Sequence, residues 1–261
     1  MQETGKENAK QDRKNNKKKW MILAVCAFAA AILLIGFIAG TWWMEKKAEQ
    51  EYLAMQEKNA EKRQKVPEEE KKIDIPVDFD SLQKENPDIY AWITIPDTVI
   101  DYPIVQSSED NAYYLNHSAE KTDSVSGAIY SENYNKKNFD DPITLLYGHN
   151  MKDGSMFASL EKYQDKQYGL DHSQFTLYLE NEVRKYNLMA VLHFELTPEN
   201  INQYYKIPES RVEFENYVDF LEEKSLYCGG YSATWGDQLL TLSTCDNKTE
   251  NGRILVVAKE L

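Results

Sequence analysis

The stretch Leu239-Leu-Thr-Leu-Ser-Thr-Cys245 is the part of the chain that best indicates its fold. Leucines alternate in it with small polar residues, the pattern of a half-buried strand. The polar segment Asp246-Asn-Lys-Thr-Glu-Asn-Gly252 predicts a turn, and Arg253-Ile-Leu-Val-Val-Ala258 predicts a second strand. If the two strands pair antiparallel, Cys245 and Arg253 come close together at the loop end of the hairpin.

A cysteine opposite an arginine is a suitable setting for a nucleophilic thiol. A nearby cation stabilises the thiolate, which is the reactive form. Free cysteines are also common as buried structural residues, so the strand pattern alone leaves that alternative open. The chain has three cysteines, too few for a disulfide scaffold, at Cys26, Cys228 and Cys245, and Cys228, next to two glycines, is expected in a loop.

His149 is the histidine whose surroundings match those of the cysteine. It follows the apolar segment Ile143-Thr-Leu-Leu-Tyr147 through Gly148 and enters a polar loop. A cysteine and a histidine that are distant in sequence and close in space are the expected layout for thiol catalysis. Of the other histidines, His172 and His193 are predicted to be structural, whereas His117 could line a cleft.

The first 43 residues consist of a basic tail and an apolar run. Residues 1–19 contain seven basic and three acidic side chains, and residues 20–43 contain none that is charged. As a helix, that run would extend about 36 Å, enough to cross a bilayer. The positive-inside rule predicts a single-pass protein in the cell membrane, with a cytoplasmic N-terminus and an extracellular C-terminal domain. The alternative is a cleaved signal peptide.

The remainder divides into a spacer and one domain. Residues 44–74 are rich in Glu, Lys, Gln and Ala and predict a charged, solvated helical stalk. Residues 75–261 are sufficient for one domain with its own core. Asp80 is predicted to cap a short helix, and Ser210 begins a capping-box pattern for a longer one. A further helix is expected over residues 155–163, and the expected strands are residues 91–95, 99–105, 127–130, 143–147, 175–179, 183–194, 239–244 and 253–259.

Composition and motif spacing exclude some classes of function. The formal charge of −13 argues against nucleic-acid binding as a main role. The chain lacks the paired His or Cys spacings of metal sites, so no metal or other cofactor is expected. Many short strands with few helices favour a mostly antiparallel barrel or sandwich.

Three separated motifs resemble those of the sortase family. Thr241-Leu-Ser-Thr-Cys245 resembles the family's cysteine signature, Leu146-Tyr-Gly-His149 its histidine motif, and Arg253 its arginine. Within the family the chain is most similar to class B. The segments that carry this likeness are Asn86–Trp92, Tyr102-Pro103, Asp110–Leu115, Gly148–Met151, Met156-Phe157 and the capped helix over 210–224.

The resemblance implies a mostly β fold. It is a closed barrel of about eight strands, with an N-terminal helix and a long helix before the catalytic-cysteine strand, preceded by one transmembrane helix. The implied activity is that of a cysteine transpeptidase with His149, Cys245 and Arg253 as catalytic residues. It would cleave a Thr–Gly type bond in the sorting motif of secreted proteins and pass them to an amine of a lipid-linked peptidoglycan precursor. The residues implied to bind substrate are Asn111, Leu115, Tyr147, Ser243 and Asp246.

Two other functions remain open on the sequence. A class B pilin polymerase would join pilin subunits through a lysine amine instead. A membrane-tethered binding module, with Cys245 as a core residue, belongs to a different class. Thiol labelling separates that module from an enzyme, because a buried core cysteine does not react.

Overall fold

A computed structural model describes residues 33–59, 75–201, 204, 206–249 and 251–261. The chain forms two units, residues 1–46 and 47–261, and the first is helical over its described residues, 33–46. No helix within the described ranges is long and apolar enough to cross a membrane. The predicted tail over residues 1–19 and residues 20–32 of the predicted anchor lie outside those ranges.

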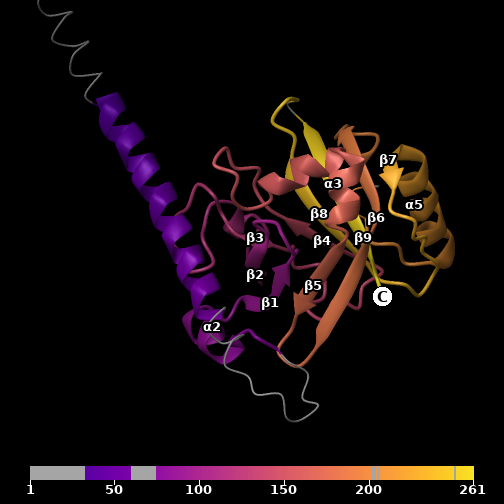
Figure 1. Cartoon of the computed structure of the whole chain (residues 1–261), viewed down its shortest axis with the longest axis horizontal. Coiled ribbons are helices and arrows are strands. Elements are labelled where there is room, and N and C mark those ends of the chain that lie inside the picture. The colour runs from indigo at the N-terminus through magenta and orange to yellow at the C-terminus, as the bar shows by residue number, and fades with distance from the viewer. Residues whose placement is uncertain (1–32, 60–74, 202–203, 205, 250) are drawn as a thin grey trace, which may run out of the picture. The chain divides into compact units, whose positions relative to one another are not determined.

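The second unit is built on a closed β-barrel (Figure 1). Eight strands follow one another in the order β5-β1-β2-β3-β4-β8-β9-β6, and pairing of β5 with β6 closes the ring. A ninth strand, β7, pairs with β6 from outside the ring. The predicted barrel of about eight strands is therefore confirmed. Its strands are β1 (Ile89–Thr94), β2 (Asp101–Val105), β3 (Ile129–Tyr130), β4 (Ile143–Tyr147), β5 (Gln174–Tyr178), β6 (Val183–Glu195), β7 (Ser225–Cys228), β8 (Leu239–Cys245) and β9 (Gly252–Glu260).

Side chains of these strands alternate between two cores. Leu146, Leu242 and Val256 belong to the core inside the barrel. Leu145 and Leu255, each one position away on its strand, belong to a second core on the outer face. This division follows from the two-residue period of a strand, which sends successive side chains to opposite faces.

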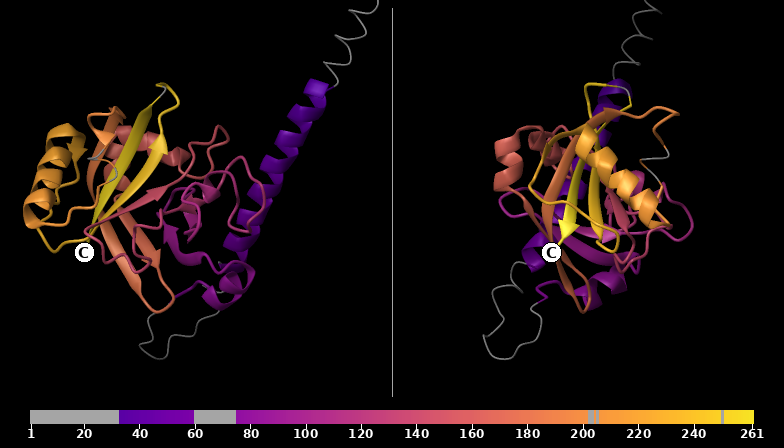
Figure 2. Two further views of the ribbon diagram at one scale, coloured as in Figure 1. Left: turned by 180° about the vertical axis from the view of Figure 1, so that it is seen from behind. Right: turned by 90° about the vertical axis from the view of Figure 1, so that its right-hand side faces the viewer.

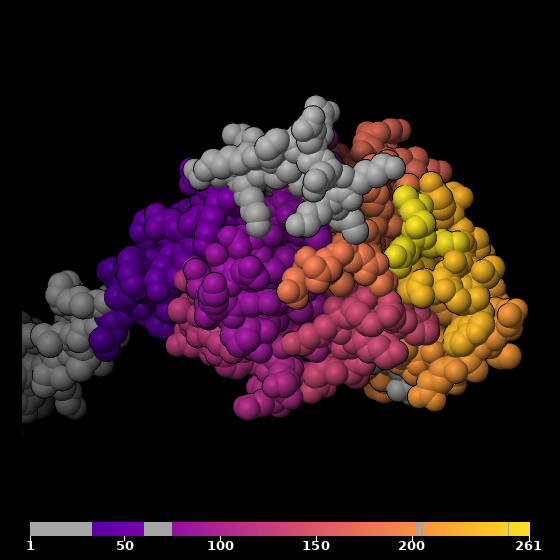
Figure 3. Space-filling model, turned by 90° about the horizontal axis from the view of Figure 1, so that it is seen from below, coloured from indigo at the N-terminus to yellow at the C-terminus, as the bar shows by residue number. Residues whose placement is uncertain are grey.

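The outer core is covered by α5 (Arg211–Lys224), which lies beside the strands in both views of Figure 2. Phe214, Val218 and Leu221 are its buried residues, spaced to form one helical face. The predicted cap at Ser210 is confirmed, since its side chain accepts a hydrogen bond from the Glu213 amide. In the space-filling view of Figure 3, the orange surface that includes α5 adjoins the yellow surface of the C-terminal part of the chain.

Three local predictions for helices and loops differ in detail from the structure. Asp78, not Asp80, caps α2 (Phe79–Glu85), because its carboxylate accepts from the Ser81 amide. The helix expected over 155–163 is a 3₁₀ helix, Ala158–Gln164, followed by α3 (Lys166–Asp171). A second 3₁₀ helix spans Tyr113–Leu115. Cys228, expected in a loop, ends strand β7.

The stalk prediction also differs from the structure. Residues 47–59 belong to the second unit and are helical, and Tyr52 and Met55 are buried in its core. The Tyr52 hydroxyl donates to the carbonyl of Gly127 at 2.9 Å, and its ring meets the Tyr102 ring edge-on. This buried side was not predicted, because most residues of the segment are charged or polar. Residues 60–74 lie outside the described ranges.

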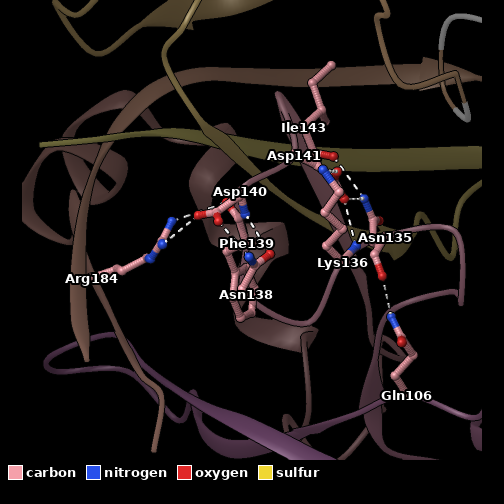
Figure 4. A network of polar contacts seen from close by, with 9 residues as sticks. All are labelled: Gln106, Asn135, Lys136, Asn138, Phe139, Asp140, Asp141, Ile143 and Arg184. Atoms are coloured by element: carbon pink, nitrogen blue, oxygen red, sulfur yellow. Dashed lines mark hydrogen bonds and ion pairs between the residues drawn. The ribbon is translucent and has the colours of Figure 1, made fainter. Parts of the chain in front are cut away.

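A polar network fixes the segment that leads into β4 (Figure 4). Asn135 is buried and bonds to the carbonyl of Ile143 at 2.9 Å and to the carboxylate of Asp141 at 3.3 Å. Gln106 donates to the Asn135 carbonyl, and Arg184 of β6 pairs with Asp140 at 2.7 Å. The start of β4 is thereby tied to two other parts of the barrel.

Candidate active site

Parallel pairing of β4 with β8 brings His149 toward Cys245. The register aligns Tyr147 with Ser243. His149 lies two positions after Tyr147, and Cys245 lies two positions after Ser243. Two hydrogen bonds hold the chain beyond Tyr147 beside β8. The Gly148 amide donates to the Ser243 carbonyl at 3.2 Å, and the Thr244 hydroxyl donates to the Gly148 carbonyl at 2.8 Å. Because parallel strands end at the same edge of the sheet, both side chains emerge there.

Antiparallel pairing of β8 with β9 places Cys245 directly across from Arg253. This confirms the hairpin expected from the sequence. Cys245 is exposed, and the Arg253 guanidinium donates to the Gly252 carbonyl at 2.9 Å. A guanidinium carries five N–H donors, so this bond leaves most of its donor capacity available. His149, Cys245 and Arg253 thus follow one another across three adjacent chain segments at one edge of the barrel.

The imidazole of His149 is oriented by a backbone group. Its Nε2 atom lies 2.7 Å from the carbonyl oxygen of Leu115. A carbonyl can only accept, so Nε2 must carry the proton. In the neutral ring, Nδ1 then holds the free lone pair. This state can take a proton from one reactant and return it to another.

Two asparagines that sequence reasoning missed connect the loops around the cysteine. The Asn150 amide donates to the Cys245 carbonyl at 3.0 Å, and the Asn247 amide donates to the Asn150 carbonyl at 3.2 Å. Each asparagine follows a functional residue by one or two positions, and this spacing is the signal that could have identified them. They hold the loops after β4 and β8 together.

Tyr147 and Ser243, both expected to bind substrate, meet a third residue that was not predicted. The Ser243 hydroxyl is buried and hydrogen-bonds to Tyr204, whose ring lies 6.4 Å from that of Tyr147. Tyr147 also stacks on Tyr130 at 5.2 Å. Burial raises the pKa of the Tyr147 hydroxyl above its ordinary range. Tyr147 and Ser243 are thus aligned two positions before His149 and Cys245, and Tyr204 of the outer core contacts both.

The remaining predicted substrate residues have different surroundings. Leu115 is 46% exposed, so its side chain is available to a ligand. The Asn111 side chain accepts from the Asn133 amide at 2.8 Å and fixes a loop. Asp246 is only 2% exposed and bonds to His193 at 2.7 Å, so its carboxylate does not face the outer surface. Within the described ranges, no three His, Cys, Asp or Glu residues are grouped so as to hold a metal ion.

Comparison with known proteins indicates the family to which the chain belongs. A family model described as a sortase domain matches residues 93–261. Sortase B of Listeria monocytogenes is 39% identical over 180 residues, which are 68% of this chain and 72% of that protein. Sortase B of Staphylococcus aureus is 28% identical over 245 residues, covering 93% and 97%.

Solved structures of the same class superpose on the chain. The Staphylococcus aureus sortase B–substrate complex gives a TM-score of 0.71 at 27% identity, covering 84% of this chain and 98% of that one. Sortase B of Bacillus anthracis gives 0.69 at 33% identity, covering 84% and 99%.

Proposed function

The chain belongs to the sortase family and is a class B cysteine transpeptidase, and from this premise we propose that Cys245, His149 and Arg253 carry its reaction. The observation that supports these roles is their order across adjacent strands: β4 leads to the histidine, β8 ends at the cysteine, and β9 begins near the arginine. A nucleophile, a proton carrier and a cation are thereby available to a single peptide bond.

In the first half-reaction the Cys245 thiolate attacks the carbonyl carbon of a sorting motif. The carbonyl oxygen becomes an oxyanion, which Arg253 stabilises through its N–H donors. As the oxyanion collapses, the carbon–nitrogen bond breaks and protonated His149 gives its proton to the departing amine. A thioester between the substrate and Cys245 remains.

In the second half-reaction an incoming primary amine attacks the thioester carbonyl. Neutral His149 takes a proton from that amine, and Arg253 again stabilises the oxyanion. The carbon–sulfur bond breaks, an amide forms and the thiolate is regenerated. A water molecule in place of the amine would give hydrolysis, so transfer depends on how well the amine competes.

The aromatic cluster of Tyr147, Tyr204 and Phe194 supports a peptide substrate. Phe194 is aligned with Arg253 on β9, and its ring lies 6.0 Å from that of Tyr204. Tyr147 and Phe194 are half-buried and Tyr204 is buried, so they form an apolar patch on the outer face of the sheet, which suits the binding of an extended segment. We assign to it the sorting motif of a secreted protein, with a Thr–Gly type bond at Cys245, and Leu115 and Tyr147 among its contacts.

The N-terminal sequence supports our proposals for the cellular location and the accepting amine. Residues 20–43, uncharged and bordered by tryptophans, are the proposed membrane anchor. An anchored extracellular enzyme meets lipid-linked peptidoglycan precursors at the membrane surface, and we propose an amino group of such a precursor as the acceptor.

The experiment is a cleavage assay of the purified chain on a library of sorting peptides, with hydroxylamine as a trapping nucleophile. A thioester intermediate converts to a peptide hydroxamate, which mass spectrometry identifies. Cleavage without any hydroxamate, or hydroxamate formation by a Cys245→Ala variant, would refute the thioester route through this residue.

A further inference from the structure

A second pair of side chains lies near Cys245 and Arg253, on the opposite face of the sheet, which is directed toward the barrel interior. His193 on β6 and Asp246, the residue after Cys245, are joined by a 2.7 Å bond between Nε2 and a carboxylate oxygen. His193 aligns with Ile254, which belongs to the inner core, whereas its neighbour Phe194 aligns with Arg253. The pair therefore occupies the face opposite to the one that carries the reactive groups.

The carboxylate of Asp246 organises the loop between Cys245 and Arg253. It accepts from the Lys248 amide at 3.0 Å and from the Thr249 hydroxyl at 3.3 Å, and the Asp246 amide donates to the Gly252 carbonyl at 2.8 Å. The buried carboxylate thus holds the first half of the loop, and the backbone amide of the same residue joins its start to its end. Burial alone would raise the pKa of Asp246, but the bonds from His193 and the Lys248 amide bring it below its ordinary value.

Gly252 leaves room for this arrangement. A Cβ atom at that position would lie 1.9 Å from the Thr249 hydroxyl oxygen, 2.9 Å from the Asp246 Cβ and 3.1 Å from its carboxylate. These separations are too short for any side chain unless the Thr249 and Asp246 side chains move. A glycine at the first position of β9 is therefore required for Asp246 to occupy its site beside His193.

We propose that His193 and Asp246 form a positioning pair that fixes the spacing of Cys245 and Arg253. This inference rests on the proposed function of those two residues. The pair contacts neither the peptide nor the reacting atoms. It acts through the loop of residues 246–252, which begins directly after Cys245 and ends directly before Arg253. Because the carboxylate is ionised and can only accept, His193 must donate through Nε2.

The pair predicts a particular response to substitution. His193→Ala leaves a buried carboxylate without its main side-chain donor, so the loop shifts and Arg253 no longer meets the developing charge correctly. Misplacement of this kind reduces turnover by about tenfold to 10²-fold. Because the proposed substrate contacts on the outer face are not altered, KM changes less than kcat. His193→Gln, which keeps an N–H donor at the corresponding distance, restores most of the activity.

The test measures peptide cleavage by the full chain and its His193→Ala, His193→Gln and Asp246→Asn variants. His172→Ala serves as the control, because His172 caps α3 and also bonds to a backbone carbonyl, that of Tyr168. The rate of Cys245 alkylation by iodoacetamide, followed by peptide mass spectrometry, is measured on the same samples. Wild-type chain that neither cleaves peptide nor alkylates at Cys245 would overturn the proposed function itself.

Given an active wild type, the variants decide the inference. We expect a fall in kcat of tenfold or more for His193→Ala, recovery in His193→Gln and no change in His172→Ala. Activity of His193→Ala within twofold of wild type overturns the positioning role, and so does equal damage in the Ala and Gln variants. If His193→Ala does not fold, Asp246→Asn decides in its place: a tenfold fall supports the pair, and unchanged kcat overturns it.

Discussion

The Nε2 atom of His149 and the carbonyl oxygen of Leu115 are 2.7 Å apart, although 34 positions separate them in the sequence. The bond fixes the ring by a main-chain atom, which side-chain substitution at residue 115 does not remove. Leu115 itself lies in a short 3₁₀ helix whose Tyr114 is buried and bonds to Asp88. The orientation of the His149 ring therefore depends on a segment that is distant in sequence from β4 and β8.

His149→Ala should reduce kcat by about 10² to 10⁴-fold, the range for loss of a general acid and base. The measurement is steady-state cleavage of a sorting peptide, with His172→Ala as the matched control. Turnover in His149→Ala comparable to that of the control would exclude His149 as the proton carrier.

Cys245→Ala should abolish both cleavage and hydroxamate formation, because the thioester cannot form without its sulfur. Cys228 is the matched control: it is also exposed, but it ends β7 on β6, away from the pairing of β8 with β4. Cys228→Ala should retain nearly full activity in the same assay. Equal loss in the two variants would contradict the assignment of the nucleophile.

Arg253→Lys should lower kcat by about 10²-fold or more, the scale for loss of one oxyanion donor. Lysine keeps the charge but lacks the planar fork of N–H groups. An interaction made only in the transition state appears in kcat, so KM should change less. Iodoacetamide alkylation of Cys245 across pH, measured in parallel, separates this role from simple stabilisation of the thiolate. Near-normal turnover with an altered alkylation profile would leave Arg253 as a charge partner alone.

Asp88 should contribute to stability in a pH-dependent way. Burial raises its pKa, but the bonds from Lys121, at 2.9 Å, and from Tyr114, at 2.7 Å, bring it below the ordinary value of 3.8. A depressed folded pKa means that the stabilisation is complete above the unfolded value and is lost as pH falls through the folded value.

The wild type should therefore lose more unfolding free energy than Asp88→Asn between about pH 5 and pH 2. Urea unfolding at each pH provides the measurement. Asp219→Asn, on the exposed side of α5, is the control and should retain the wild-type slope. An Asp88→Asn slope equal to that of wild type would show that the pair with Lys121 adds nothing.

Tyr52→Phe should destabilise the second unit by about 1–3 kcal/mol, the cost of leaving buried polar groups without a partner. The lost hydroxyl donates to Gly127 and accepts from the Ala119 amide at 3.3 Å. Tyr231→Phe, which removes an exposed hydroxyl, should change stability by about 0.5 kcal/mol or less. Equal unfolding midpoints in urea would place residues 47–59 outside the cooperative unit.

The catalytic segments were the most predictable part of the fold because their local patterns are strong. The strand Ile143–Tyr147 was predicted at its observed bounds, and the hairpin of Cys245 with Arg253 follows from two apolar runs and one polar loop. The role of Tyr52 was hidden, because a helix rich in Glu and Lys buries only a few positions. β7 was missed because Ser225–Cys228 is too short to show an alternating pattern of its own.

Contacts between distant side chains could not be inferred from one sequence. Asp246 was expected in the substrate groove, yet the two-residue period of β8 turns it inward to His193. Tyr204, joined to Ser243 across 39 positions, lies between β6 and α5, where the sequence shows no regular pattern. Such pairings depend on how the barrel closes, and local propensity carries no information about that.

The parallel pairing of β4 with β8 also has a consequence for the order of folding. The bond between Thr244 and Gly148 joins positions 96 residues apart, and such non-local contacts form slowly, since a long loop must close first. During synthesis β8 is made after β4, because it follows β4 in the chain. Until it inserts beside β4, Cys245 has neither His149 nor a completed barrel edge beside it. In a chain whose β8 has not yet paired with β4, the proposed nucleophile therefore lacks the proposed proton carrier, and activity is expected only from the complete barrel.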